Sequence, residues 1–243
     1  VILITTKRGK EGKASVQIKA NVTAKVASKL PEKYDAYDTF YLMNNSIERE
    51  ACLNPSGWGN YTPTAIIDKY RHPANLEEWD RYPNVDWEDV LFRNGSHQNY
   101  EVNAQGGNER TKFYTSFGYT KQEGITLQSG YERITGRANM SHTADRVTIE
   151  ASTMFTNSTQ NVNSEGTSFS SPIMCLAMTA SPSTFPYNED GTFSTSFPAL
   201  NGANPLQTAT YNYDRSTIVR TLNTLSATCL LYTSPSPRDP KTS

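Results

Sequence analysis

The chain has 243 residues and a formal net charge of -1, which argues against a partner as negative as nucleic acid. Hydrophobic residues make up 36% of it and the mean hydropathy is -0.62; no apolar run approaches the roughly 18 to 20 residues of a membrane-spanning helix. These totals exclude a helical membrane span but leave a soluble protein and a membrane β-barrel open, because barrel strands alternate and keep the mean hydropathy low. The 14 Tyr residues suit either a polar ligand cleft or the aromatic belts of a barrel.

Strand-like sequence opens the chain. Residues 1–6, VILITT, are rich in β-branched residues and precede a basic turn over residues 7–13. Residues 14–26, ASVQIKANVTAKV, then alternate without interruption between apolar side chains such as Ile18 and polar ones such as Lys19. Because successive side chains of a strand point to opposite sides, this segment is predicted to be a strand with one apolar and one polar face.

Two helices and a loop are predicted to follow. Residues 35–53 repeat apolar side chains at helical spacing, with Asp35 well placed as the N-cap. Residues 64–70, which lie between two prolines, are predicted to form a second short helix. Residues 73–95 are expected to form an ordered loop. Two tryptophans are expected to pack this loop, Trp79 and Trp87.

Alternating strands return in the second half of the chain, where short turns make neighbours antiparallel. Gly106, Gly107 and Asn108 predict a tight hairpin between the first two of these strands. Polar, Asn/Ser/Thr-rich stretches are expected to be loops at residues 157–171 and 182–204. The four predicted strands are residues 99–105, 112–120, 132–141 and 145–155, and residues 215–228 form one more with poor alternation.

The charged residues of the predicted strands gather opposite the apolar faces. A Lys or Arg on the lipid side of a barrel costs about 2 to 4 kcal/mol near the midplane, and each strand keeps one face free of them. A soluble sandwich alternates in the same way, although its core face usually carries more Leu, Ile and Phe than the Ala, Val, Gly and Thr found here. In a barrel, the residues expected on the lumen wall, some paired across strands, are Lys19, Lys25, Glu101, Arg133, Arg137, Arg146 and Glu150.

No catalytic, cofactor or metal site is predicted, and we expect no enzyme. The histidines and cysteines lack the spacing of a metal site, and three cysteines do not make a disulfide framework. The NEDG stretch lacks the further ligands of a calcium loop, and acidic neighbours in sequence say nothing about the carboxylate separation of a glycosidase. The residues considered are His72, His97, His142, Cys52, Cys175, Cys229, residues 188–191, and the pairs Glu77/Glu78 and Glu88/Asp89.

The Pro/Ser-rich residues 229–243 are interpreted as foreign to the protein. Back-translated, residues 229–239, CLLYTSPSPRD, can be written with the codons of the transposon-end adapter used in shotgun sequencing libraries. We therefore expect native sequence to end near Thr228 and residues 229–243 to be adapter read-through. A flexible linker is the alternative. Different codons in the raw nucleotide reads would refute the adapter hypothesis.

Several short segments, in the order in which they occur along the chain, resemble segments of one protein family. VILITTKRGKEGK at the start is similar to the end of the plug domain and its exit into the barrel in SusC/RagA-type TonB-dependent outer-membrane transporters. The match continues over most of residues 1–228. Its further parts are DAYDTFYLMNN, PNVDW at residues 83–87, GGNERTKFYTSFGYTKQEGI at residues 106–125, and RITGRANMS at residues 133–141.

This resemblance implies an all-β fold: a piece of a large antiparallel transmembrane β-barrel of about 22 strands, with short helices inserted between strands. Residues 1–13 would be the end of the plug and its exit, and residues 14–228 the first barrel strands and loops. The family implies nutrient uptake across the cell outer membrane, with import of glycan or peptide fragments driven by TonB-ExbB-ExbD under a SusD-like lipoprotein lid. The plug segment that contacts TonB would lie upstream of Val1.

Two other classes remain open at this point. A soluble all-β carbohydrate-binding or glycan-degrading module would also suit the Trp and Tyr content. A passive porin is the third possibility, although porins lack the plug strand that VILITT resembles.

Overall fold

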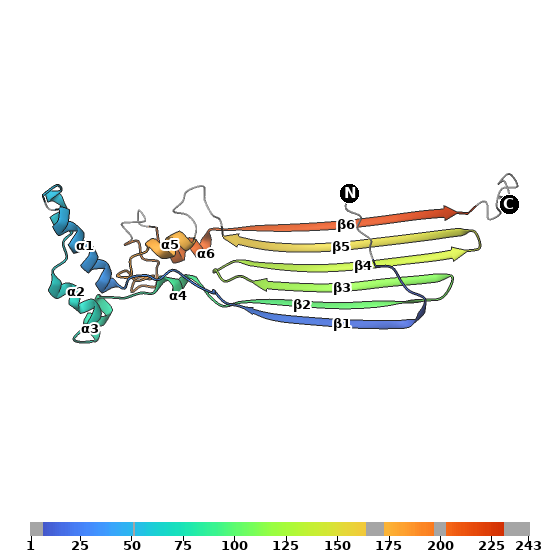
Figure 1. Ribbon diagram of the computed structural model, residues 1–243, viewed down its shortest axis with the longest axis horizontal. Helices are drawn as coiled ribbons and strands as arrows, with labels where there is room; N and C mark the ends of the chain where they lie inside the picture. The colour runs from blue at the N-terminus through green and yellow to red at the C-terminus, as the bar shows by residue number, and fades with distance from the viewer. Residues whose placement is uncertain (1–6, 51, 164–172, 197–202, 231–243) are drawn as a thin grey trace, which may run out of the picture.

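One open antiparallel sheet dominates the computed structural model, which describes residues 7–50, 52–163, 173–196 and 203–230 (Figure 1). Its strands lie side by side in chain order, and every neighbouring pair is antiparallel. The all-β prediction is confirmed. The strands are β1 (Gly12–Lys25), β2 (Gly95–Gly107), β3 (Thr111–Glu123), β4 (Gly130–Ala144), β5 (Val147–Asn163) and β6 (Tyr213–Cys229).

The register of the strands confirms the predicted alternation. Ile18 of β1 stands opposite Val102 of β2, which stands opposite Phe117 of β3. One residue further along β1, on the other face, Lys19 stands opposite Glu101. A slip of one residue would exchange the two faces of a strand, so the pattern on each strand specifies its pairing.

Strand β5 is longer than predicted, and the expected loop over residues 157–171 is wrong in its first part. β5 continues to Asn163, where it still pairs with Tyr213 of β6. The polar side chains suggested a loop, but ladder hydrogen bonds to β4 and β6 hold this segment extended whatever its side chains prefer. Residues 164–171 lie outside the described residues.

The strand predicted at residues 215–228 is confirmed as β6, which pairs along its whole length with β5. Its last residue, Cys229, stands opposite Val147. Residues 1–6 and 231–243 lie outside the described residues. The predicted opening strand and the adapter hypothesis for residues 229–243 therefore stay predictions.

Two of the helices were predicted from hydrophobic spacing. Helix α1 (Ala36–Glu50) begins after Asp35, whose carboxylate accepts a hydrogen bond from the backbone N–H of Asp38 at 2.7 Å. Helix α2 (Thr64–Arg71) follows Pro63. A 3-10 helix, η1 (Pro55–Asn60), lies between them and was not predicted.

The loop predicted at residues 73–95 is wrong, because two short capped helices occupy most of it. α3 (Leu76–Arg81) is capped by the Asn75 side chain, which accepts from the N–H of Glu78 at 2.9 Å. α4 (Trp87–Leu91) is capped by Asp86. Helices this short show no hydrophobic periodicity, and only their caps mark them in sequence.

The helices all lie beyond one end of the sheet, which we call the long-loop end (Figure 1). Helices α5 (Ile173–Thr179) and α6 (Pro205–Tyr211) lie there in the β5–β6 connection. At the opposite, short-turn end the strands are joined by the short connections at residues 108–110 and 145–146. None of the described helices is long and apolar enough to cross a membrane.

The hairpin between β2 and β3 depends on a glycine at its corner. Gly107 has φ +151°, and a Cβ there would lie 2.3 Å from the carbonyl oxygen of Thr111. In Gly107→Ala we expect the free energy of unfolding to fall by about 1 to 3 kcal/mol, because the backbone conformation is strained for an L side chain and the partner strand must shift. The measurement is urea unfolding of the complete protein, followed by circular dichroism in the β-sheet band.

Gly136→Ala in β4 is the matched control. A Cβ at Gly136 meets nothing within 4 Å, so its unfolding midpoint should stay within error of the wild type. Equal losses in the two variants would contradict the steric explanation.

Candidate functional site

An N-terminal strap, residues 7–11, lies across one face of the sheet. Arg8 Nη1 pairs with Glu150 Oε1 of β5 at 2.8 Å, and Asn139 Nδ2 of β4 donates to the carbonyl oxygen of Lys7 at 2.7 Å. The strap then leads into β1 at the short-turn end (Figure 1). We call the face it crosses the polar wall; it is the face that carries Gln17, Lys19, Glu101, Asn103, Tyr114, Arg133, Arg137, Asn139 and Glu150.

The strap sits directly on the backbone of β3. A Cβ at Gly9 would lie 2.5 Å from the carbonyl oxygen of Phe113, so only glycine allows this approach. The Arg8–Glu150 ion pair is partly exposed, with 71% and 36% of the two side chains accessible. A pair in such a place contributes only about 0.2 to 1 kcal/mol. Close packing at Gly9 and the hydrogen bond from Asn139 therefore do most to position the strap.

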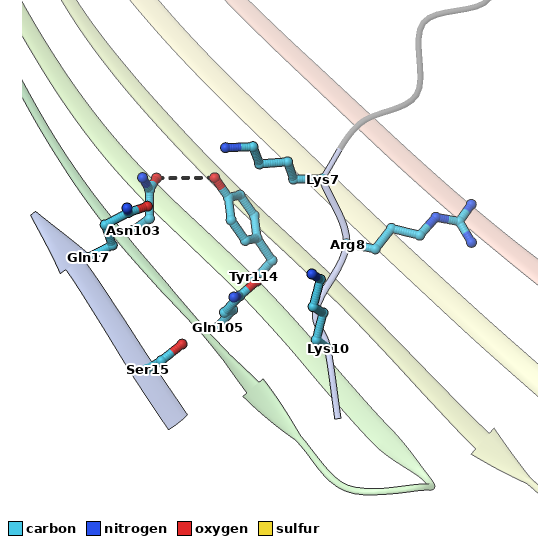
Figure 2. Close-up of a pocket in the computed structure, with 8 residues that line it drawn as sticks. All are labelled: Lys7, Arg8, Lys10, Ser15, Gln17, Asn103, Gln105 and Tyr114. Atoms are coloured by element: carbon cyan, nitrogen blue, oxygen red, sulfur yellow. Dashed lines mark hydrogen bonds between the residues drawn. The ribbon is translucent and has the colours of Figure 1, made fainter. Parts of the chain in front are cut away.

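A pocket of about 310 Å³ lies between the strap and strands β1 to β3 (Figure 2). Tyr114 donates its hydroxyl to Asn103 Oδ1 at 3.1 Å, and both residues are 6% exposed. The Nδ2 group of Asn103 is buried and has no hydrogen-bond partner among the described residues. The pocket therefore offers an unused donor beside two ammonium groups. Its lining is Lys7, Arg8, Lys10, Ser15, Gln17, Asn103, Gln105 and Tyr114.

Six of the seven predicted wall residues lie on the polar wall. Lys19 and Glu101 stand directly opposite each other, as cross-strand pairing predicts, although no ion pair joins them. Arg146 is the exception: it lies in the turn at residues 145–146, and its carbonyl oxygen accepts from the N–H of Leu230 at 2.9 Å. Asp145, with φ +49°, makes that turn, so β5 begins one residue after Arg146 and the prediction is wrong there.

The sequence placed Asn103 on the polar face, but nothing in it signalled the pocket. The burial of Asn103 depends on Tyr114 and on the strap, which reaches the wall from a distant part of the chain. Gly9 is the one sequence feature that could have signalled the strap, because a glycine allows the backbone to approach another strand closely.

The opposite, apolar face of the sheet is uncovered in the described structure. Val16, Ile18 and Val22 are 66%, 73% and 69% exposed, although their face is the one a soluble sandwich would bury. A soluble protein rarely shows so large a continuous apolar surface to water.

The apolar band runs diagonally across the strands. Near the long-loop end β1 is still apolar at Val22, but the same row continues through Gln98, Lys121 and Glu132. At the short-turn end the band instead extends on the later strands, through Ala144, Val147 and Cys229. A band of constant height crosses tilted strands at such a slant, and barrels require strands that tilt by about 35 to 45°.

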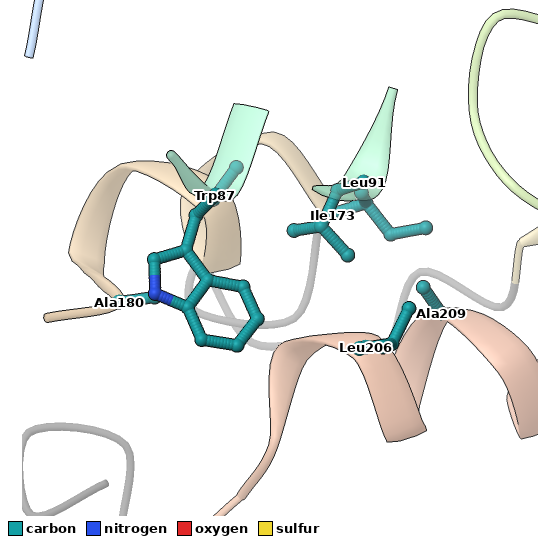
Figure 3. Packing of buried hydrophobic residues seen from close by; sticks show 7 residues of the cluster. Trp87, Leu91, Ile173, Ala180, Leu206 and Ala209 are labelled. Atoms are coloured by element: carbon teal, nitrogen blue, oxygen red, sulfur yellow. The ribbon is translucent and has the colours of Figure 1, made fainter. Parts of the chain in front are cut away.

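At the long-loop end, the β1–β2 connection packs against the β5–β6 connection (Figure 3). We call these two connections together the loop cap. The Trp87 indole N–H donates to the carbonyl oxygen of Ser181 at 2.9 Å, and the N–H of Val85 donates to that of Pro182 at 2.7 Å. Trp87 is fully buried, as predicted, whereas Trp79 is 63% exposed and does not pack the segment. The buried core comprises Trp87, Leu91, Ile173, Ala177, Ala180, Leu206 and Ala209.

Lys33 ties the first connection to the end of α5. Its ammonium group donates to the carbonyl oxygens of Ala177 and Ala180, which lie at the C-terminal end of that helix. Burial lowers the pKa of Lys33, and the nearby carboxylates of Asp86 and Glu88 oppose the shift. Burial likewise raises the pKa of Glu88. The two connections are thus joined by hydrogen bonds from the Lys33 ammonium group as well as by apolar packing.

Arg71 organises the helices of the first connection. Its guanidinium pairs with Asp35 at 2.9 Å and Asp38 at 3.3 Å, and lies 4.0 Å from the centre of the Tyr37 ring. Burial alone would raise the pKa of Asp35. Hydrogen bonds from the N–H of Asp38 and from Arg71 outweigh it, so that pKa lies below its ordinary value of 3.8.

The residues considered for metal binding or catalysis do not gather. Among the described residues, no group of three His, Cys, Asp or Glu side chains could hold a metal ion. Glu78 pairs with Lys69 at 2.7 Å, and Asp190 in the NEDG stretch accepts from Thr192 in a turn. His72, His97 and His142 belong to separate elements: the end of α2, β2 and β4.

The loop cap core should depend on Trp87. In Trp87→Ala we expect the cap to lose about 3 to 5 kcal/mol of local stability, because a fully buried indole and its hydrogen bond to Ser181 are removed. Hydrogen exchange of α4, α5 and α6 measures the loss. Trp79→Ala is the control and should leave exchange in these helices unchanged, since Trp79 is mostly exposed. Similar effects of the two substitutions would contradict the assigned core.

The Asp35–Arg71 contact predicts a pH dependence of α1 and α2. The folded pKa of Asp35 lies below the ordinary value of 3.8, so its stabilising contribution is present above that value and is lost as the pH falls through the folded pKa. Hydrogen exchange in α1 and α2, corrected for intrinsic rates at about pH 6 and about pH 3, should show this loss. In Asp35→Asn the helices should be less protected at pH 6 and the pH-dependent loss should be smaller. An unchanged pH dependence in that variant would contradict the assignment.

The chain is similar in sequence to TonB-dependent receptors. It is 31% identical over 147 residues to the TonB-dependent receptor SusC of Bacteroides thetaiotaomicron, a match that covers 58% of this chain and 12% of SusC. It is 28% identical over 143 residues to the TonB-dependent receptor P26 of Formosa agariphila, covering 58% and 12%, and 24% identical over 140 residues to P3 of the same organism, covering 58% and 11%. No protein-family model matches the chain. The matched part of the chain thus spans about an eighth of the length of these relatives.

Solved structures share the fold. The RagAB peptide importer in its closed-closed state superposes with a TM-score of 0.56 at 18% identity, covering 79% of this chain and 23% of that one. The open-open state gives a TM-score of 0.53 at 19% identity over the same shares. The predicted resemblance to SusC/RagA-type TonB-dependent receptors is confirmed, and the open sheet is similar to part of such a barrel. These relatives are named as receptors and importers, not as enzymes.

Proposed function

We propose that this chain is part of the barrel of a TonB-dependent importer in the cell outer membrane, which takes up oligosaccharide or peptide fragments. The observation that carries the proposal is the contrast between the two faces of the sheet: a strap crosses the polar wall, and an exposed apolar band slants across the other side. A barrel explains both faces at once, with lipid on the outside and a wet, partly filled lumen inside.

The apolar band ends in the way a lipid-facing band should. Tyr100 and Tyr119 stand opposite each other on this face, with ring centres 6.5 Å apart. The next row towards the long-loop end contains Gln98 and Lys121. Tyr side chains at the edge of an apolar band followed by charged residues are typical of the aromatic belt at a membrane surface.

The connections give the barrel an orientation. Outer-membrane barrels have short turns on the periplasmic side and long loops outside. The short-turn end of this sheet would therefore be periplasmic, and the loop cap built around Trp87 would be extracellular. The strap enters β1 at the short-turn end, as a chain leaving a plug domain inside the barrel would.

Partners follow from the resemblance to the family. We propose energising by TonB-ExbB-ExbD and a SusD-like lipoprotein lid seated on the loop cap. The cap suits a partner, because large aromatic side chains are exposed on it, which is typical of protein interfaces. The exposed aromatics of the two connections include Tyr34, Tyr41, Trp58, Trp79, Phe185, Tyr187 and Tyr211.

The soluble carbohydrate-binding or glycan-degrading module is less well supported. Such a module must bury the apolar face of its sheet against a second layer, and no described element covers Val16, Ile18 or Val22. A passive porin does not account for the similarity to TonB-dependent receptors.

The membrane assignment is tested with two substitutions in β1 of the complete protein. In Ile18→Arg we expect a loss of about 2 to 4 kcal/mol of folding stability in lipid and a sharp drop in the folded, heat-modifiable form in outer-membrane fractions, because the guanidinium would face hydrocarbon. Asn21→Arg on the same strand is the matched control; its side chain faces the polar wall away from the pocket beneath the strap, so assembly should be near normal. Equal assembly of the two variants would refute the lipid assignment.

Import is tested in cells that produce the complete protein, with fluorescently labelled oligosaccharides and peptides. Accumulation should require the protein and should stop when the proton-motive force is dissipated or TonB is deleted. Uptake that persists in de-energised cells would refute active import and favour a passive pore.

A further inference from the structure

Three arginines converge on one region of the polar wall. Arg133 and Arg137 lie four residues apart on β4, about 13 Å along the strand. Arg220 lies on β6, opposite Thr156, and Thr156 in turn stands opposite Thr135. Arg220 therefore occupies the row midway between the two β4 arginines, two strand spacings or about 10 Å away. Directly opposed residues share a face, so the three side chains stand on the same side of the sheet.

The three guanidinium groups have no carboxylate partner within the described residues. Arg137 donates to Met154 Sδ at 3.1 Å, a weak acceptor, and no ion pair involves Arg133 or Arg220. The carboxylate of Glu150 on the same wall is already paired with Arg8. Asp214 lies six residues along β6 from Arg220, about 20 Å away. Glu101 stands on the same wall in the row of Thr135 and Arg220, two strand spacings or about 10 Å from Thr135. Within the described residues the three guanidinium groups therefore outnumber the nearby wall carboxylates and form no ion pair with them.

Unused donors continue along the wall towards the short-turn end. The pocket beneath the strap contains the buried Asn103 Nδ2 group, which has no hydrogen-bond partner in the described part of the chain, and the ammonium groups of Lys7 and Lys10 (Figure 2). No ion pair is formed by either lysine within the described ranges. This is a second observation, independent of the arginines, of donors without acceptors on the same face.

The surroundings of the arginines favour a sugar as the carrier of the negative charge. Between β4 and β6, strand β5 presents the hydroxyl and amide side chains of Thr156, Ser158 and Gln160 to the polar wall. Apolar side chains on the same face flank Arg220, namely Met154, Ile218 and Leu222. Hydroxyl and amide groups both donate and accept hydrogen bonds, which matches the hydroxyls of an oligosaccharide. Guanidinium groups bind carboxylate and other oxyanions in a bidentate manner.

We infer that Arg133, Arg137 and Arg220 form a recognition site on the lumen wall for oligosaccharides that bear carboxylate or sulfate groups. The inference rests on the proposed import function and narrows its substrate class. A positively charged wall in a narrow lumen raises the local concentration of an anionic substrate, and the bidentate contacts then select it over neutral sugars.

The test is calorimetric binding to the complete transporter in detergent, with tetragalacturonate, a sulfated neutral tetrasaccharide, neutral galactotetraose and tetraglutamate as probes. We expect at least one anionic sugar to bind about tenfold or more tightly than the neutral sugar, with an affinity that falls as salt is raised. Replacing all three arginines by glutamine should weaken that binding by about 30-fold or more and leave the neutral sugar unaffected. Which anionic sugar responds distinguishes carboxylate from sulfate.

Matched controls separate the site from general charge and from folding. Lys19→Gln removes a positive charge from the same wall, opposite Glu101, and should change binding less than twofold. Replacing the three arginines by lysine should retain the salt dependence but lose part of the affinity, because lysine cannot bind in a bidentate manner. Heat-modifiable migration checks assembly, and Arg220→Gln alone replaces the triple variant if that variant does not assemble.

Three results would overturn the inference: equal binding of neutral and anionic sugars, unchanged binding in the glutamine variant, or tetraglutamate bound more tightly than either anionic sugar, which would indicate an acidic peptide. Energised uptake of an anionic oligosaccharide by the glutamine variant at the wild-type rate would also overturn it while leaving the import function intact. Loss of the proposed function would instead appear as uptake without energy or as a protein absent from the outer membrane.

Discussion

The register of the antiparallel ladder is the constraint on which the rest of the structure depends. Because side chains alternate with a period of two, the pairing of Ile18 with Val102 places Lys19 and Glu101 on the opposite face, and each later strand repeats the choice. In the proposed barrel, hydrocarbon would make this choice costly to reverse, since a one-residue slip would turn the cationic side chains towards lipid. A wall that can bind polar ligands and a surface that can meet lipid therefore follow from one pattern of pairing.

The N-terminal strap determines the shape of the polar wall where it lies on it. The strap is seated by the contact of Gly9 with the backbone of β3 and by the hydrogen bond from Asn139 to Lys7, and the pocket around Asn103 exists because the strap covers part of the wall. The three arginines lie further from the short-turn end, where no described segment covers them. The same wall thus has a portion that the strap covers and a portion that the described residues leave uncovered.

Local patterns predicted what local physics controls. The strands, α1 and α2 follow from alternation, helical spacing and caps. The helices α3 and α4 were missed because helices so short are stabilised by caps and tertiary contacts and not by periodicity. Asn157 was assigned to a loop by its polarity, yet pairing with Ile134 and Val219 keeps it in β5. Trp79 and Trp87 look alike in sequence, and only the packing of α5 and α6 against Trp87 distinguishes them.

The sequence by itself determined the two faces of each strand and the antiparallel order of neighbouring strands, because side-chain alternation and short turns depend on residues that are adjacent in the chain. It also carried the resemblance to SusC/RagA-type receptors. Only the tertiary structure decided that the strap crosses the polar wall, that Arg220 joins Arg133 and Arg137, and that two distant connections share the core around Trp87. Each of these features brings together segments that are far apart in the chain. Their geometry depends on the register of several strands together, which no single stretch of sequence encodes.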